Sequence, residues 1–217
     1  SYTAGADYRQ KLMAGEAAYN DPEVATAMET WKSLVDAGYF VPDANAYDWT
    51  DAADQVANGQ AAMTLMGTFI TGYWDGNGLV PGEDYDFFPF PVINPDLPVV
   101  THGTVDGWAV PASAANPDGA KALLLHMLSP ESQATWALGQ GALAAVSNVD
   151  TSIYSPVMKK ASDYLAQVQF LSGYDLSTTP PMAEGGLNMF AEFMNDPSGY
   201  LGYLDEAEAV AVEVFAK

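Results

Sequence analysis

The chain has 217 residues, of which 49% are hydrophobic, so it can bury a substantial core in one large or two small domains. Seven basic residues against 28 acidic ones give a formal net charge of −21, which would repel the phosphate backbone of nucleic acids and anionic membrane surfaces. The absence of cysteine excludes disulfides, thiolate nucleophiles and sulfur-ligated metal ions.

The first predicted element is a helix in the segment from Asn20 to Gly38. Asn20 can cap the free backbone N–H groups, Pro22 suits the first turn, and Gly38 offers a left-handed end. Apolar residues recur along this segment at helical spacing, which predicts a face buried in a core. They are Val24, Met28, Trp31, Leu34 and Val35.

A short helix, a buried strand and an extended link are expected next. The stretch TDAADQVANG predicts a helix that Thr50 caps and Gly59 ends, and AAMTLM, residues 61–66, predicts the buried strand. Residues 78–98 are rich in proline and glycine, which argues against regular helix. This segment is therefore expected to link two structural units.

The middle of the chain predicts one strand and then two helices. Residues 104–110 can form the strand, and Asn116 opens a helix whose apolar stripe matches the template for a core-facing side. The stripe comprises Ala120, Leu123, Leu124, Met127 and Leu128. A further helical turn begins at Ser129 and ends at Gly139 and Gly141.

The last third of the chain predicts three helices and a loop. From residue 152 a helical stripe comprises Val157, Met158, Ala161, Leu165 and Val168. A polar, Pro-rich loop spans residues 171–186, and helical spacing resumes with Leu187, Phe190, Ala191 and Met194. A final helix is expected from about Asp205, where Asp205 and Glu208 resemble a capping box, to the end of the chain.

Most catalytic and metal-binding patterns are missing from the sequence. His102 and His126 are 24 residues apart, no His-rich or Cys-rich metal motif is present, and neither a G-x-S-x-G turn nor a phosphate-binding loop occurs. Among 28 acidic residues, a pair of carboxylates in a cleft remains an open alternative, since glycoside hydrolysis needs only such a pair. No apolar run approaches the length of a membrane span, and the N-terminal residues lack the pattern of a signal peptide.

Four stretches, in this order, resemble the C-terminal half of family 1 extracellular solute-binding proteins, the maltose-binding-protein-like carbohydrate receptors of ABC importers. They are DPEVATAMETWKSLVDAGYF, VANGQAAMTLMGTF, VDGWAVPASAANPDGAKALLLHMLSPESQ and PPMAEGGLNMFAEFMNDPSG. The resemblance covers nearly the whole chain. It implies a helix-rich α/β structure of the periplasmic-binding-protein-like two-lobe fold (type II), with only the C-terminal half present.

The resemblance also implies how the chain divides between the lobes. Residues 1–88 are expected to form a segment of the second lobe, residues 89–144 to cross over into the first lobe, and residues 145–217 to return to the second lobe with the C-terminal helices. Family members are considerably longer, so the missing N-terminal part of the same protein is an expected partner. Without that part, residues 89–144 would leave strand edges and apolar faces uncovered.

Candidate ligand-binding residues follow from this resemblance and from the chemistry of sugars, whose apolar faces stack on aromatic rings and whose hydroxyls bind acids. Phe69 stands where the family has a stacking Trp, and Tyr73 and Trp74 follow in the same expected loop. Asp106 and Trp108 lie where related receptors place an acid near the sugar. For Trp108, packing in a core is an equal alternative, because strand alternation can turn it to either face.

Glu184 and Gly185 fall in the expected loop where the maltose receptors carry an aromatic platform. The lack of aromatic residues there favours a monosaccharide or a short oligosaccharide over a long one. The resemblance thus implies a non-enzymatic sugar receptor that docks on an ABC transporter permease, located in the periplasm or outside the cell and lipid-anchored through the missing N-terminus. No cofactor, catalytic residue or metal is expected. A carbohydrate-active hydrolase and a non-binding structural fragment remain as alternatives.

Overall fold

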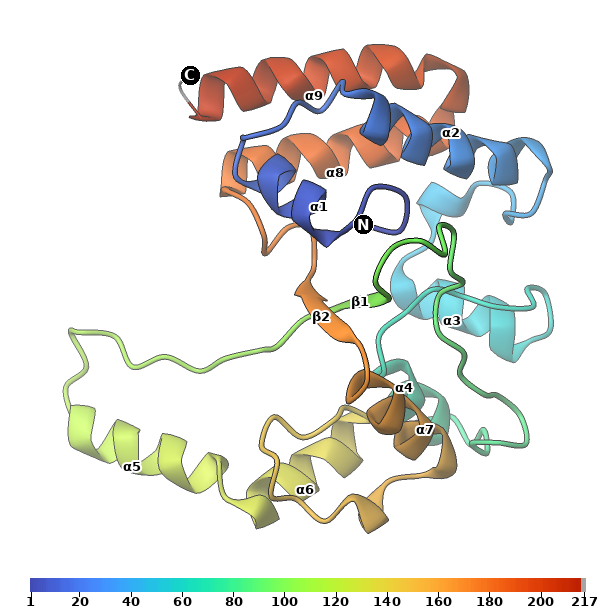
Figure 1. The fold of residues 1–217 in the computed structure, drawn as a ribbon. Coiled ribbons are helices and arrows are strands. Elements are labelled where there is room, and N and C mark those ends of the chain that lie inside the picture. The colour runs from blue at the N-terminus through green and yellow to red at the C-terminus, as the bar shows by residue number, and fades with distance from the viewer. Residues whose placement is uncertain (216–217) are drawn as a thin grey trace. The chain divides into compact units, whose positions relative to one another are not determined.

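The computed structural model describes residues 1–215, which form a helix-rich α/β structure with two compact units (Figure 1). Unit 1 consists of Ser1–Asp48, Phe90–Thr104 and the chain from Val168 onward. Unit 2 consists of Trp49–Pro89 and Val105–Gln167. Each unit is therefore assembled from separate segments of the chain. Along the described residues, no helix combines the length and apolarity that crossing a membrane requires.

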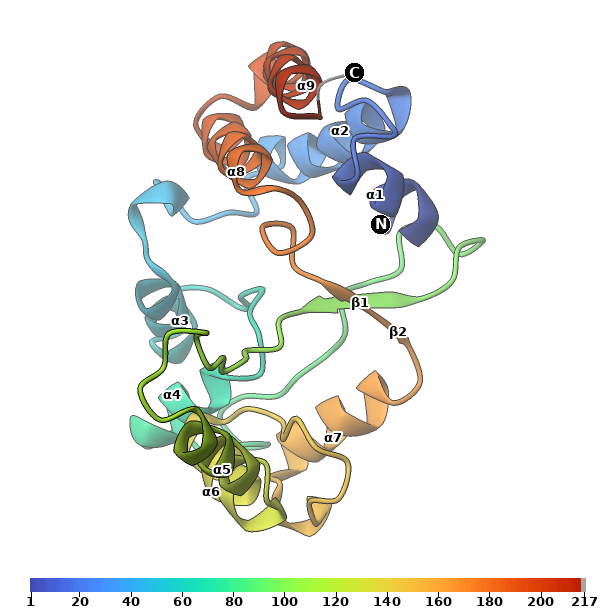
Figure 2. The same ribbon diagram turned by 90° about the vertical axis from the view of Figure 1, so that its left-hand side faces the viewer.

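Helices dominate unit 1. They are α1 (Ala6–Met13), α2 (Pro22–Asp36), α8 (Pro180–Asn195) and α9 (Tyr200–Phe215), with short 3-10 helices η1 (Ala44–Ala46) and η3 (Pro197–Gly199). Helices α8 and α9 lie side by side in Figures 1 and 2, and α2 contacts α9. Their facing residues form a buried core that comprises Met13, Tyr19, Met28, Met182, Met189, Phe193, Leu204, Ala207 and Ala211.

Helix α2 confirms the predicted element between residues 20 and 38. The N-cap is Asp21 rather than Asn20, and Gly38 has the expected left-handed φ of 73°. Asp21 makes no capping bond within the helix, because its Oδ2 accepts hydrogen bonds from the Tyr8 hydroxyl (3.1 Å) and the Ala18 N–H (3.0 Å). Met28 is buried as predicted, whereas Leu34 at the edge of the stripe is 42% exposed.

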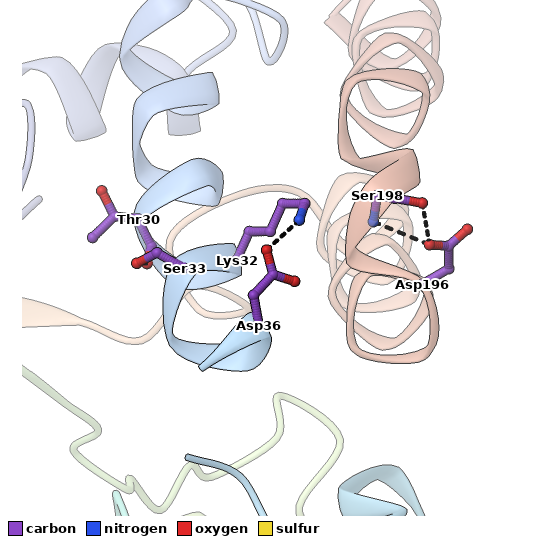
Figure 3. A network of polar contacts seen from close by, with 6 residues as sticks. All are labelled: Thr30, Lys32, Ser33, Asp36, Asp196 and Ser198. Atoms are coloured by element: carbon purple, nitrogen blue, oxygen red, sulfur yellow. Dashed lines mark hydrogen bonds and ion pairs between the residues drawn. The ribbon is translucent and has the colours of Figure 1, made fainter. Parts of the chain in front are cut away.

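The surface beside the C-terminal end of α2 carries two separate polar contacts, which Figure 3 shows. Lys32 pairs with Asp36 one helical turn later, and the carboxylate of Asp196 accepts hydrogen bonds from the backbone N–H and the hydroxyl of Ser198. These bonds from Ser198 lower the pKa of Asp196 below its ordinary value. An exposed ion pair between residues one helical turn apart, such as Lys32–Asp36, contributes at most about 0.5 kcal/mol to stability.

Strands β1 (Val100–Gly103) and β2 (Gln169–Ser172) form a two-stranded parallel sheet in unit 1, with Val100 opposite Gln169. Arg9 of α1 donates a hydrogen bond from Nη2 to the Ser172 carbonyl oxygen at 2.6 Å. The strand predicted at residues 104–110 is wrong, since the observed strand ends at Gly103 and the residues after it form no regular structure. The sequence also gave no sign of β2, which follows directly on the predicted helical stripe.

Unit 2 contains α3 (Trp49–Ala57), α4 (Ile70–Gly76), α5 (Pro117–Met127), α6 (Pro130–Gln140), η2 (Thr151–Ile153) and α7 (Pro156–Leu165). Its core cluster comprises Ala53, Ile70, Trp74, Tyr85 and Val157. The predicted stripe on α7 is confirmed for Val157, Met158 and Ala161, all buried. The caps of the two middle helices are confirmed as well: Asn116 Oδ1 accepts from the Gly119 N–H at 3.0 Å, and Ser129 caps α6.

The predicted strand at residues 61–66 is wrong. These residues form no strand, and the side chains of Met63 and Leu65 are 65% and 77% exposed. Only one side of the segment packs, since Met66 contacts the unit 2 core. An apolar run becomes a strand only when a neighbouring strand satisfies its backbone N–H and C=O groups. The described residues supply no such neighbour.

Two predicted boundaries near the C-terminus are also wrong. Helix α8 starts at Pro180, so the expected loop at residues 171–186 ends seven residues early, and helix α9 starts at Tyr200 rather than Asp205. The supposed capping pair lies inside α9 and binds another segment: Asp205 accepts from Asn20 Nδ2 at 2.9 Å, and Glu208 accepts from the Tyr19 N–H at 2.7 Å. The last two positions of the predicted final helix lie outside the described residues.

The net charge of −21 predicts that salt stabilises the fold. Raising the ionic strength shortens the screening length from about 30 Å at 0.01 M to about 3 Å at 1 M, which weakens repulsion among the carboxylates. Between these two salt concentrations we expect the melting temperature to rise by at least about 3 °C. For a chain of this size, that shift corresponds to an increase of about 1 kcal/mol in the free energy of unfolding. Thermal unfolding followed by circular dichroism in NaCl measures it, with choline chloride as the control for screening. A melting temperature that falls or stays constant contradicts the prediction.

Candidate functional site

Three aromatic rings of unit 2 form a partly exposed cluster, which we call the aromatic corner: Trp49, Phe69 and Tyr73. Trp49 is the first residue of α3, and Phe69 immediately precedes α4. Their ring centroids are 5.2 Å apart and the ring planes stand at 87°. Tyr73, one turn into α4, places its ring 5.4 Å from that of Trp49. Trp49 is 42% exposed and Phe69 41%, so each keeps apolar surface open to solvent.

The local backbone explains how the corner is held. The Phe69 ring folds back over Gly67, where a Cβ atom would lie 2.8 Å from Phe69 Cε1, so a larger residue at position 67 would displace the ring. The Tyr73 hydroxyl donates a hydrogen bond to Asp54 Oδ1 on α3 at 3.0 Å. This bond joins the two helices that carry the rings. The corner is therefore positioned by helices and not by a free loop.

Trp74 does not belong to the corner. Its side chain is 6% exposed, its Nε1 donates to the Ala53 carbonyl oxygen at 3.3 Å, and its ring lies 4.8 Å from that of Tyr85. Successive residues of a helix point about 100° apart, so Tyr73 and Trp74 face different surroundings. Burial raises the pKa of Tyr85, and its hydrogen bond to Asp75 raises that pKa further. Trp74 therefore stabilises the core of unit 2, in contrast to the expected ligand contact.

Asp106 and Trp108 lie in an exposed segment of unit 2 without regular secondary structure. Trp108 is 70% exposed, so it does not pack in a core, which was one of the two alternatives for this residue. No ring contact joins Trp108 to the aromatic corner among the described residues. The expectation that Asp106 stands inside an apolar strand is wrong, because this segment forms no strand.

Glu184 and Gly185 belong to unit 1 and lie in the first turns of α8, not in a loop. The Glu184 side chain is exposed, whereas Gly185 faces α9, where an added Cβ would lie 3.4 Å from Val210 Cγ1. Gly185 thus serves helix packing. Of the residues singled out from the sequence in unit 2, the structure places Phe69 and Tyr73 together against the ring of Trp49.

Trp49 is the residue that sequence reasoning missed. It directly precedes Thr50, the expected helix cap, and apolar residues at that position commonly pack against the first turns of a helix. An aromatic residue before a predicted helix start was therefore the available signal. The described residues contain no group of three or more His, Asp or Glu side chains able to hold a metal ion.

Comparison with known sequences identifies related transport proteins. The profile of the family described as bacterial extracellular solute-binding protein matches residues 2–134. An uncharacterized ABC transporter extracellular-binding protein of Pyrococcus horikoshii is 30% identical over 212 residues, which are 97% of this chain and 45% of that protein. A second such protein of the same organism is 38% identical over 81 residues, or 36% of this chain and 19% of that protein.

Comparison with solved structures identifies two sugar-binding proteins. The bacterial solute receptor AcbH, described as having an exclusive preference for β-D-galactopyranose, matches with a TM-score of 0.86 and 25% identity. A chitin oligosaccharide binding protein matches with a TM-score of 0.85 and 21% identity, a likeness of fold. Each match covers 99% of this chain and 55% of the other. The helix-rich fold is thus that of solute-binding proteins, and the chain spans about half the length of these relatives.

Proposed function

Because this chain belongs to the bacterial extracellular solute-binding protein family, we propose that it is part of a receptor that binds a monosaccharide or short oligosaccharide for an ABC importer. The proteins it resembles are described as binding proteins and receptors, which supports a non-enzymatic role. The receptor delivers its ligand to the membrane permease. It acts in the periplasm or outside the cell, with a lipid anchor on the remaining part of the protein.

The aromatic corner is the observation that carries the sugar assignment. A pyranose ring exposes one flat face of C–H groups, and burying that face against an aromatic ring removes apolar surface from water. Trp49 and Phe69 supply two such surfaces at nearly a right angle. This geometry suits one compact ring better than the extended platform on which a long oligosaccharide would lie. The preference stated for AcbH, a single galactopyranose, supports the same size of ligand.

Further ligand contacts are proposed only from residues whose side chains are not buried. Phe69 and Tyr73 stay in the proposed site, and Trp49 joins them. Asp106, Trp108 and Glu184 stay proposed ligand contacts as well, because their side chains are exposed and because carboxylates bind sugar hydroxyls and an indole ring can stack on a sugar face. Trp74 and Gly185 leave the proposed site, because each packs within its own unit.

Isothermal titration calorimetry against a panel of saccharides tests this function. The panel comprises D-galactose, D-glucose, N-acetylglucosamine, maltose and chito-oligosaccharides, with a tripeptide and Ca²⁺ as ligands of other classes. We expect saturable heat from at least one saccharide and none from the peptide or the ion. Heat from the peptide or Ca²⁺ without any from a saccharide would contradict the proposal. Hydrolysis of an aryl glycoside that disappears when a carboxylate is replaced would contradict the non-enzymatic assignment.

A further inference from the structure

Unit 1 contains a cavity of about 230 Å³ at the C-terminal ends of α2 and α8, which we call the α2–α8 cavity. Val35 of α2 and Met194 of α8 line it and also pack against the buried core of unit 1. Phe40 and Val41 line it from the chain that follows α2. None of the residues that line this cavity is a proposed sugar contact, so it is a feature that the sugar assignment leaves unexplained.

The polar side of the cavity is held in place by hydrogen bonds to α8. Asn45 of η1 donates from Nδ2 to the Ala191 carbonyl oxygen at 2.8 Å and to Asn195 Oδ1 at 2.9 Å. These bonds use both amide hydrogens, so the Asn45 side chain can offer a ligand only its acceptor, Oδ1. Asp43, whose backbone has a left-handed φ of 54°, also lines the cavity, and its carboxylate does not cap η1. An ionised carboxylate only accepts hydrogen bonds, so both side chains suit a ligand that donates them.

The charges around the cavity favour a cation. A helix C-terminus carries roughly −0.5 elementary charge, and neither α2 nor α8 has a basic residue in its last turn to offset it. None of the residues that line the cavity is basic, and Lys32 on α2 is already paired with Asp36 (Figure 3). The net charge of −21 adds a general preference for cations over anions.

The walls and the volume of the cavity limit the rest of the ligand. Val35, Val41 and Met194 are partly buried, and Phe40 is 41% exposed, so apolar surface faces any occupant. An aromatic side chain packs against another ring and attracts a cation to its face. A cavity of about 150 Å³ admits benzene, so 230 Å³ has room for one ring with a short aminoalkyl chain. Larger ligands occupy pockets of about 300–1,000 Å³.

We propose that the α2–α8 cavity binds a small aromatic amine, which carries a primary ammonium group on one ring through a short alkyl chain. The ammonium group donates hydrogen bonds to the Asp43 carboxylate and to Asn45 Oδ1. The ring packs against the apolar walls. An alcohol of the same size lacks the charge, and a carboxylic acid carries the wrong one. The chain thus has a second ligand site, which takes a class of molecule other than a saccharide.

Two-dimensional NMR of the isotope-labelled chain tests the ligand class with phenethylamine as the probe. Phenethyl alcohol and phenylacetate are controls of similar size, and Nα-acetyl-lysine amide presents the ammonium group of a protein side chain without a ring. We expect phenethylamine to shift the backbone amide signals of residues 43–45 and 194–195 to saturation, and each control to bind at least about tenfold more weakly. A smaller difference from any control, or shifts confined to other residues, would overturn the proposal.

Two matched pairs of variants test the site. Asp43→Asn keeps a residue that tolerates the left-handed backbone and should weaken phenethylamine binding at least about tenfold, whereas Asp7→Asn removes an exposed carboxylate of α1 and should not. Ala44→Phe fills the cavity and should abolish binding, whereas Ala46→Phe lies in η1 outside the lining and should preserve it.

Unchanged affinity in Asp43→Asn, or equal losses within either pair of folded variants, would overturn the proposal. Melting temperatures show which variants fold, and if Ala44→Phe does not, the Asp43→Asn and Asp7→Asn pair decides. No measurement involves a saccharide or a residue of the aromatic corner, so failure here is distinct from failure of the proposed function.

Discussion

Replacing Phe69 with alanine is expected to weaken saccharide binding about tenfold while the protein remains folded. A sugar face covers about 60 Å² of apolar ring surface, which at about 25 cal/mol per Å² contributes about 1.5 kcal/mol. This free energy corresponds to about tenfold in affinity. Because Phe69 is 41% exposed and forms an edge-to-face ring pair with Trp49, its loss should lower the free energy of unfolding by only about 1 kcal/mol.

Titration calorimetry and urea unfolding of the same variant separate the two effects. Phe88→Ala is the matched control, since Phe88 is also an exposed phenylalanine of unit 2, at 57%, and lies outside the aromatic corner. Trp49→Ala should reproduce the loss of affinity. If Phe69→Ala loses stability and keeps its affinity, the ring belongs to the core and the proposed stacking role is wrong.

Gly186→Ala is expected to destabilise unit 1 by about 3 kcal/mol. A Cβ atom at this position of α8 would lie 1.9 Å from the Tyr174 hydroxyl, so the tyrosine has to move. That hydroxyl lies 2.9 Å from the Tyr19 hydroxyl and 3.3 Å from the Met182 carbonyl oxygen, and Tyr19 is only 1% exposed. Overpacking and an unsatisfied buried hydroxyl each cost about 1–3 kcal/mol.

Urea unfolding measures this effect against Gly202→Ala, the control on α9. An added Cβ at Gly202 meets no atom within 4 Å, so alanine there should stabilise the helix by about 0.5–1 kcal/mol. Adding Tyr174→Phe to Gly186→Ala removes the clashing oxygen and should restore part of the loss. Equal stability of the two alanine variants would show that Tyr174 adapts without strain.

Local signals predicted α2, α3, α5, α6 and α7, because those signals act within a few residues, whereas the sequence predicted no helix at α1 or α4. Pro22 and Gly38 marked α2, Asn116 and Ser129 capped the middle helices, and three of the five residues of the predicted stripe on α7 are buried. Strands were predicted poorly, since a strand depends on a partner far away in sequence. Residues 61–66 have the composition of a strand and lack the neighbour that would make them one.

The same contrast between local signals and contacts of residues far apart in sequence applies to the candidate site. The position of Phe69 was predicted through its resemblance to the family, whereas its ring neighbour Trp49 was missed because twenty residues separate the two in sequence. The glycines around Trp74 predict a loop, whereas a helix forms there and turns Trp74 into the core. Pro180 and Pro181 suit a loop and equally the first turn of a helix, and because they begin α8, Glu184 lies in a helix and not in the expected loop.

Saturation-transfer NMR on this chain tests the central claim that the aromatic corner binds a sugar. Irradiating the aromatic protons should transfer magnetisation to the C–H groups on one face of at least one saccharide of the panel, even when binding is weak. The double variant Trp49→Ala/Phe69→Ala should abolish the transfer, and Phe88→Ala should preserve it. No transfer to any saccharide, or undiminished transfer in the double variant, would contradict the account.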